Sequence, residues 1–267
     1  MNTEQLKKQF ESIGANLYIR TPMVSNDPPR RSERFTIDTS ARGDGFVLTP
    51  GDVQFEVVAT DNNDSHLLLM AVMDADEPDP RNRDKRKFLC GRDERNWFVA
   101  GVRSNASSIK DAKESLKPDE AMASQRIYKV SGKHLNSRKN KGFTRQGEWF
   151  FIPEPDLDVN QDEIHRVEPL RMGGKRAHMA EELFRSGGTS VRVCSEYPNG
   201  VTESEYKKII SEDPGKATLP WRYMVRDAGV WVRGKIRHPD HNTINLKFWH
   251  RVLPSREVGS SNVAFLD

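Results

Sequence analysis

The chain has 267 residues, enough for one large domain or two small ones. Hydrophobic residues make up 35% and charged residues 30%, with a formal net charge of +3, which excludes a disordered or collagen-like chain and favours a globular protein. No run of about 18 apolar residues occurs, so neither a membrane-spanning helix nor a membrane partner is expected.

The two cysteines, Cys90 and Cys194, are too few for a disulfide framework and form no CxxC pair. Cys90 follows Phe-Leu and Cys194 follows Val-Arg-Val, and we expect both to be small buried hydrophobes. The first fourteen residues hold no long apolar run, so no secretory signal is expected. A reduced, cytoplasmic setting is the resulting expectation.

The charges are segregated along the chain. Residues 126–145 carry seven Lys or Arg and no acid, whereas residues 146–168 carry seven acids and one Arg. Residues 215–256 carry nine Lys or Arg against two acids. Such basic blocks either attract an anionic partner or are neutralised by the acidic blocks within the fold, and the sequence leaves both interpretations open.

The first half of the chain is expected to be rich in strands. Apolar spacing predicts a helix over residues 3–13 with Thr3 as its N-cap, followed by a loose connection over residues 20–45. A second short helix is expected over 107–116, and a mobile basic loop over 131–147. The acidic, proline-containing stretch 153–163 predicts a boundary between regions 1–160 and 161–267; the alternative is one integrated domain. Strands are predicted over 53–60, 67–73, 87–91, 96–102 and 148–152.

The second half begins with a helix predicted over 175–185, which Gly187 and Gly188 would end. A strand over 190–194 follows. Thr202 and Glu205 match a capping box, which predicts a helix over 203–211. The expected fold class is α+β, a predominantly antiparallel β-sheet with about four short helices and a C-terminal β-hairpin over 230–252.

The hairpin has the clearest pattern in the sequence. Because strand side chains alternate between two faces, Val230, Val232 and Ile236 should pack on one face with apolar residues of the return strand. A three-residue loop, 239–241, would keep apolar positions opposite each other and set 238 opposite 242. Trp231 would then face Trp249 on the second face.

This second face would combine two indoles with cations, a combination that suits stacking on bases and gripping phosphate. Nucleic-acid binding is therefore our first functional hypothesis, with the basic loop 133–145 in support. In the competing interpretation, the indoles pack inside the protein and the cationic side chains lie around them. The predicted nucleic-acid-binding residues are Trp231, Arg233, Lys235, Arg237, Lys247, Trp249, Arg251, Lys139 and Lys141.

Histidines gather at the tip of the same hairpin. His238, Asp240 and His241 are candidate metal ligands, because imidazole and carboxylate both suit zinc. His178 is a candidate third histidine or, with Glu182 one helical turn later, half of a catalytic acid–base pair. The plain alternatives are a turn at 238–241 and a surface ion pair at 178–182. His250 is expected to lie near residue 230, away from His238.

Three functions from different classes therefore stay open. The first, nucleic-acid binding, needs no cofactor. The second is a metal-dependent hydrolase or nuclease with a divalent ion at the hairpin tip. The third is a scaffolding protein that meets its partners through the charge blocks. The sequence determines neither the catalytic residues nor the oligomeric state.

Overall fold

The computed structural model describes residues 2–20, 35–51, 53–73, 77–79, 81, 83–171 and 176–258, together with the backbone of 265–266. Contacts divide the chain into two units, Met1–Lys141 with Ser255–Ser260, and Gly142–Pro254 with Ser261–Asp267. The division thus falls at residue 141, whereas the acidic stretch suggested residue 160. No helix among the described residues is long and apolar enough to cross a bilayer.

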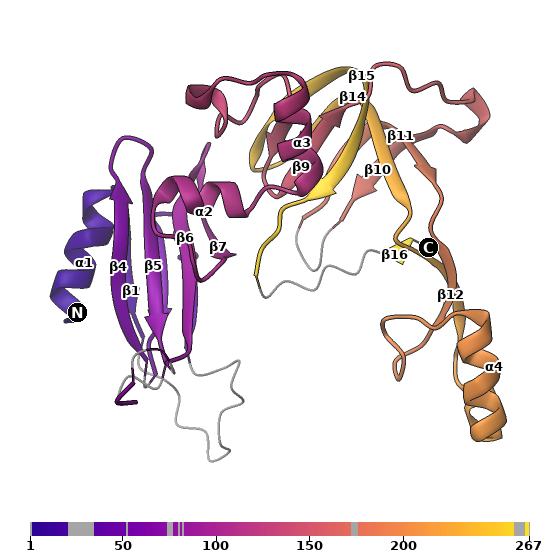
Figure 1. Cartoon of the computed structure of the whole chain (residues 1–267), viewed down its shortest axis with the longest axis horizontal. Helices are drawn as coiled ribbons and strands as arrows, with labels where there is room; N and C mark the ends of the chain where they lie inside the picture. Colours follow the sequence, from indigo (N-terminus) through magenta and orange to yellow (C-terminus); the bar gives the residue numbers. More distant parts are fainter. Residues whose placement is uncertain are drawn as a thin grey trace. The chain divides into compact units, whose positions relative to one another are not determined.

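The first unit is built around an antiparallel four-stranded sheet whose order is β4-β5-β6-β7 (Figure 1). One face packs against α1 and a small sheet of order β1-β3-β2; the other packs against α2. β5 serves both cores, because Leu67 and Leu69 point to the first and Leu68 to the second. Its elements are α1 (Thr3–Ser12), β1 (Asn16–Ile19), β2 (Thr36–Thr39), β3 (Gly45–Thr49), β4 (Gln54–Asp61), β5 (His66–Val72), β6 (Lys85–Asp93), β7 (Asn96–Val102), α2 (Ile109–Ser115), α3 (Asp119–Ile127) and a 3-10 turn, η2 (Gly132–His134).

Most of the expected elements of this unit are present, with several differences. The cap of α1 is Asn2, which forms a capping box with Gln5, so the Thr3 assignment was wrong. The segment expected to be a loose connection contains β2, and β1, β3 and α3 were not foreseen; residues 21–34 lie outside the described residues. The loop expected over 131–147 contains η2 and β8, and Phe143 within it is buried.

The second unit is an antiparallel six-stranded sheet of order β10-β11-β14-β15-β9-β8. Its inner face buries one core, which draws Trp149 and Phe151 from β9, Leu183 from β11, and Val232 and Ile236 from β14. Its strands are β8 (Thr144–Gln146), β9 (Trp149–Pro153), β10 (His165–Leu170), β11 (His178–Ser186), β14 (Gly229–His238) and β15 (His241–Pro254), with a 3-10 turn, η3 (Gln161–Glu163), before β10.

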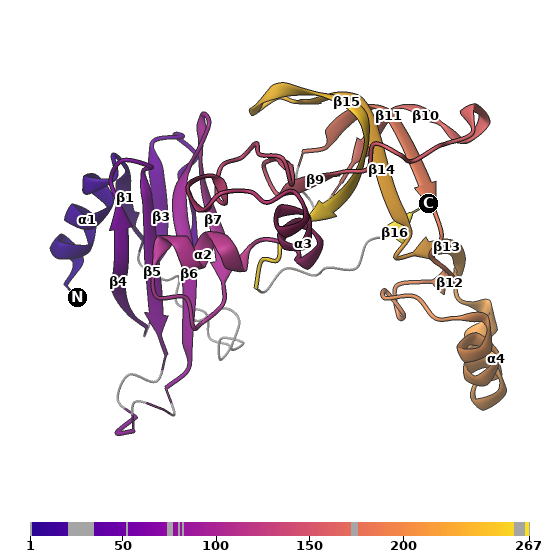
Figure 2. The same cartoon turned by 45° about the horizontal axis from the view of Figure 1, so that its top comes forward.

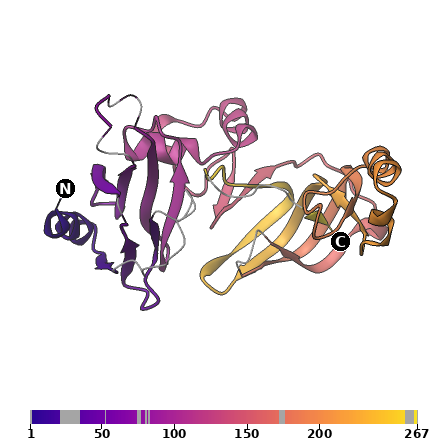
Figure 3. The ribbon, with the colours of Figure 1, turned by 90° about the horizontal axis from the view of Figure 1, so that it is seen from below.

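A smaller sheet of order β12-β13-β16 continues from β11 and carries α4, whose capping box at Thr202 and Glu205 is confirmed. Figures 2 and 3 show that α4 lies at the end of the unit opposite the turn between β14 and β15. The elements are β12 (Thr189–Val193), α4 (Glu203–Glu212), a 3-10 turn, η4 (Pro214–Thr218), β13 (Arg222–Arg226) and β16 (Phe265–Leu266). The expected α+β class with mostly antiparallel pairing and a C-terminal hairpin is confirmed.

The helix predicted over 175–185 was wrong, because residues 178–186 form strand β11. A β-bulge between Ala180 and Glu182 explains the error. The bulge puts Ala180 and Leu183 on the same buried face, and this three-residue gap is also the spacing of one helical turn. Gly187 and Gly188 have positive φ angles as expected, but they connect two strands.

The hairpin is present, and its central register is as predicted, with Ile236 opposite Ile244 and Lys235 opposite Asn245. The turn was wrong: His238 pairs with His241, so the loop has only two residues. A second irregularity lies at Arg233, where three residues of β15, 247–249, stand opposite this single residue of β14. Because of it Trp231 faces Arg251 rather than the predicted Trp249.

Candidate metal centre

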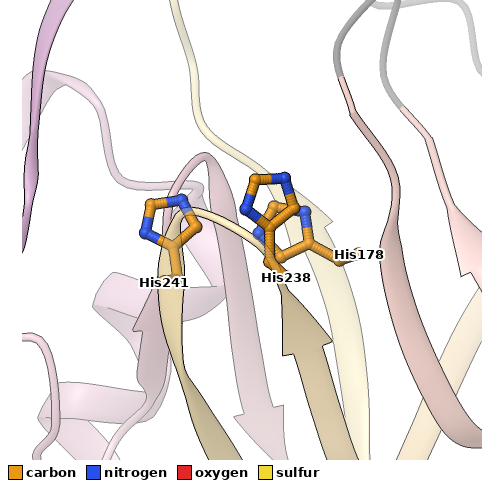
Figure 4. Close-up of side chains that lie close together, drawn as sticks. All are labelled: His178, His238 and His241. Carbon is orange, nitrogen blue, oxygen red and sulfur yellow. The ribbon is translucent and has the colours of Figure 1, made fainter. Parts of the chain in front are cut away.

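Three strands of the second unit bring three histidines together. Met179 on β11 pairs with Arg237 on β14, so the adjacent residues, His178 and His238, come opposite one another. His238 in turn pairs with His241 across the two-residue turn. His178 shares the inner face of the sheet with Ala180, and it is buried. Figure 4 shows the three side chains gathered beside the turn between β14 and β15, at one end of the sheet whose inner face buries the core.

The three rings lie in contact with one another. The ring centroids of His178 and His238 are 4.2 Å apart, those of His238 and His241 4.8 Å, and those of His178 and His241 5.5 Å. One ligand nitrogen from each ring lies within 4.8 Å of the others. The metal candidates His238 and His241 and the third histidine, His178, thus share one place, although His178 comes from a strand and not from the predicted helix.

Hydrogen bonds at the turn orient His238. Its Nδ1 accepts from the backbone N–H of Asp240 at 3.2 Å, which leaves Nε2 to donate to the carbonyl of Arg176 at 3.3 Å. A metal ion would replace one of these bonds. A neutral hydrogen bond contributes about 1 kcal/mol, whereas zinc held by structural sites contributes about 10 kcal/mol or more. The existing bonds therefore do not prevent metal binding at His238.

The spacing of the nitrogens requires a small adjustment around a metal ion. Zinc–nitrogen bonds of about 2.0–2.1 Å in a tetrahedron place the nitrogens about 3.3 Å apart. The present limit of 4.8 Å means that the widest pair would approach by about 1.5 Å. Rotation of rings at the ends of three strands supplies such a movement without changing the sheet.

The turn between β8 and β9 covers the cluster, a feature that the sequence did not reveal. Gly147 lies in this turn with φ +57°, and a Cβ built on it would stand 2.9 Å from Nε2 of His241 and 3.4 Å from Nε2 of His178. A larger residue here would therefore have to displace the ring of His241, and at this φ it would also be strained. Gln146, beside it, is almost fully buried, and its Nε2 donates to the carbonyl of Asn242 at 2.6 Å.

Asp240, the remaining metal candidate, is partly exposed at the tip. Its carboxylate lies 3.9 Å from Nδ1 of His238 and 3.6 Å from the guanidinium of Arg176. The predicted helical pair of His178 with Glu182 does not form, because four residues of a strand span about 13 Å. Glu182 instead accepts from Arg233 at 2.6 Å.

The basic and aromatic residues of the hairpin are less available than the sequence suggested. Trp249 is buried, and the guanidinium of Arg233 lies over its ring at 4.7 Å. Trp231 is half-buried, and its Nε1 donates to Glu154 at 2.8 Å. The guanidinium of Arg251 lies over the ring of Trp231 at 6.0 Å. Trp249 is thus withdrawn from solvent, and Trp231 is only partly accessible.

Three of the predicted cations on the hairpin stay exposed, namely Lys235, Arg237 and Lys247. Lys139 and Lys141 are exposed as well, and they belong to the first unit. His250 lies opposite Val232, far along the strand from the cluster as expected. It is buried, and desolvation lowers its pKa.

No family model, no curated protein and no solved structure matches this chain. The case for a function therefore depends on the chemistry of the residues themselves.

Proposed function

We propose that this protein binds one transition-metal ion, zinc by preference, through the imidazoles of His178, His238 and His241. The proposal is carried by one observation: three ligand nitrogens lie within 4.8 Å of each other at one end of the core. Imidazole is a ligand of intermediate softness that suits zinc, copper, nickel and iron, whereas magnesium and calcium prefer sites made of oxygen.

The surroundings of the cluster support this proposal. His178 is held by an interior strand, β11, and His238 and His241 flank a two-residue turn, so the three side chains are positioned on rigid elements. The protein therefore loses little conformational freedom when it binds the ion. The carbonyl of Arg176 lies 3.3 Å from Nε2 of His238 and can accept its proton, as outer partners of metal-bound histidines do, so that Nδ1 would be the metal ligand in place of its bond from the N–H of Asp240.

The test is zinc titration of untagged, chelator-treated protein by calorimetry. We expect one zinc ion per chain, and a variant with His238→Ala or His241→Ala should lose more affinity than the roughly 10–100-fold that removal of an outer partner causes. His165→Ala is the matched control, because His165 is exposed on β10 of the same unit. Absence of stoichiometric binding, or equal affinities for the control and the cluster variants, would refute the proposal.

Nucleic-acid binding stays a second candidate because Lys235, Arg237 and Lys247 are exposed along one hairpin. Three phosphate contacts predict that log K falls with log salt concentration with a slope no steeper than about −3. Replacing all three cations by glutamine should remove this dependence. A flat salt dependence in the unchanged protein would exclude the mechanism.

A further inference from the structure

The strands that flank the Gly147 turn place two more polar side chains at the histidine end of the core. Gln146 and Trp149 are directly opposed across β8 and β9, and antiparallel partners point to the same face. Trp149 belongs to the inner core, so Gln146 points inward too. The turn between them touches the rings of His178 and His241.

Each of these two side chains carries a buried polar atom that no group in the described part of the chain satisfies. Among the described residues, none donates to Oε1 of Gln146, and none accepts from Nε1 of Trp149. Gln146 is only 1% exposed, so its carbonyl is shielded from bulk water. Leaving a buried polar atom unsatisfied costs about 1–3 kcal/mol, so such atoms normally mark a bound water or ion.

The location of Oε1 of Gln146 indicates whether its partner is a water or an ion. The amide of Gln146 is fixed by its bond to the carbonyl of Asn242, the residue that follows His241. The free acceptor therefore lies within the same end of the core as the three imidazoles. Because Oε1 is a hydrogen-bond acceptor, it does not attract an anion, and its partner must be a group that carries a proton.

We infer that the fourth ligand of the metal is a water molecule, and that Oε1 of Gln146 accepts one of its protons. This inference depends on the proposed metal site and states what kind of site it is. Three protein ligands plus water are the arrangement of catalytic zinc sites, whereas structural sites use four protein ligands. Gln146 is then a positioning residue, and the water can be exchanged for small anions such as azide.

This arrangement would favour the hydrolase hypothesis among the functions that the sequence left open. Zinc makes a bound water a good nucleophile near neutral pH. A closed site with four protein ligands holds no water and cannot supply this nucleophile. The Gln146 carbonyl would orient one proton of the water and so direct a lone pair of its oxygen away from the turn.

The experiment uses cobalt-loaded, untagged protein, because the visible absorption of cobalt reports a change of ligand. We expect azide to change the spectrum with saturation. Gln146→Glu, which places a negative charge beside the exchangeable ligand, should weaken azide binding at least tenfold while the protein still holds one cobalt ion. Gln161→Glu, an exposed substitution in the same unit, should leave azide affinity unchanged.

The outcomes separate the two proposals. One bound cobalt with a spectrum that azide leaves unchanged means a closed site, and it overturns the inference but not the metal site. Equal azide affinities for the unchanged protein and Gln146→Glu remove Gln146 from its assigned role. Failure to bind cobalt or zinc at all overturns both. The azide titration of the unchanged protein gives its answer even when the Gln146 variant does not fold.

Discussion

Substitution of Gly147 by alanine tests whether the turn between β8 and β9 is part of the metal site. The new Cβ would stand 2.9 Å from Nε2 of His241, whereas attractive contacts begin near 3.5 Å. The imidazole must therefore move by about 0.6 Å. The nitrogens must also close in around zinc, and a methyl group against the His241 ring restricts that rotation, so zinc affinity should fall about tenfold or more, as it does when an outer partner is lost.

Alanine at this position also has a backbone cost that must be separated from the steric one. The φ of Gly147 is +57°, and a non-glycine residue in this region loses about 1–2 kcal/mol. Gly187→Ala is the matched control, because its φ is +72° and nothing lies within 4 Å of the added Cβ. Both variants should lose about 1–2 kcal/mol of unfolding free energy without metal.

The assays are urea unfolding of the metal-free proteins and competition for zinc against a chelating dye. The reasoning predicts similar losses of stability in the two variants, and a loss of zinc affinity in Gly147→Ala alone. Equal zinc affinities for the two variants would show that the turn does not contact the bound ion, and the assignment of Gly147 to the site would be refuted.

Three further predictions concern the first unit and the thiols. Desolvation lowers the pKa of His66 to about 4, so up to about 3 kcal/mol of stability should be lost as pH falls from 6.5 to 4. His66→Gln should flatten the plot of unfolding free energy against pH. Parallel plots for the variant and the unchanged protein would contradict this prediction. Lys117→Met should lower the free energy of unfolding in urea by about 1–3 kcal/mol, because the buried ammonium donates to Glu114 and to the carbonyl of Leu135. An unchanged urea midpoint would contradict this prediction. Burial raises the pKa of the Cys90 thiol, so a thiol reagent should label it only after unfolding, and rapid labelling of the native protein would oppose this.

Local rules predicted the parts of the fold that local interactions determine. The capping box at Thr202 and Glu205 gave α4 to within a residue, and the alternation in 230–252 gave the hairpin and its buried face. The sequence also suggested that His178 could join His238 and His241. These signals depend on residues close together in the chain, or on the symmetry of a single hairpin.

The errors arose where a bulge changes the spacing. In β11 the bulge converts a two-residue alternation into the Ala180–Leu183 gap, which resembles a helix. With that strand read as a helix, Glu182 was assigned to its surface. In the sheet Glu182 faces Arg233 and neutralises part of the predicted basic face. No local pattern reports this pairing, because 51 residues separate the two side chains.

The two faces of β14 allow the remaining functional hypotheses to be separated with neighbouring residues. His238 lies on the inner face with Ile236, while Arg237 between them points outward and is exposed. Zinc binding should therefore respond to His238 and be indifferent to Arg237→Gln, whereas binding to a phosphate backbone should respond to Arg237. The nuclease hypothesis requires both faces in one reaction. It predicts that His238→Ala and Arg237→Gln each weaken nucleic-acid binding, and that they do so only when metal is present. Arg237 and His238 are adjacent in the sequence, so a substitution that unfolds the hairpin would weaken zinc binding and nucleic-acid binding together. A substitution that weakens only one of the two therefore reports a specific function.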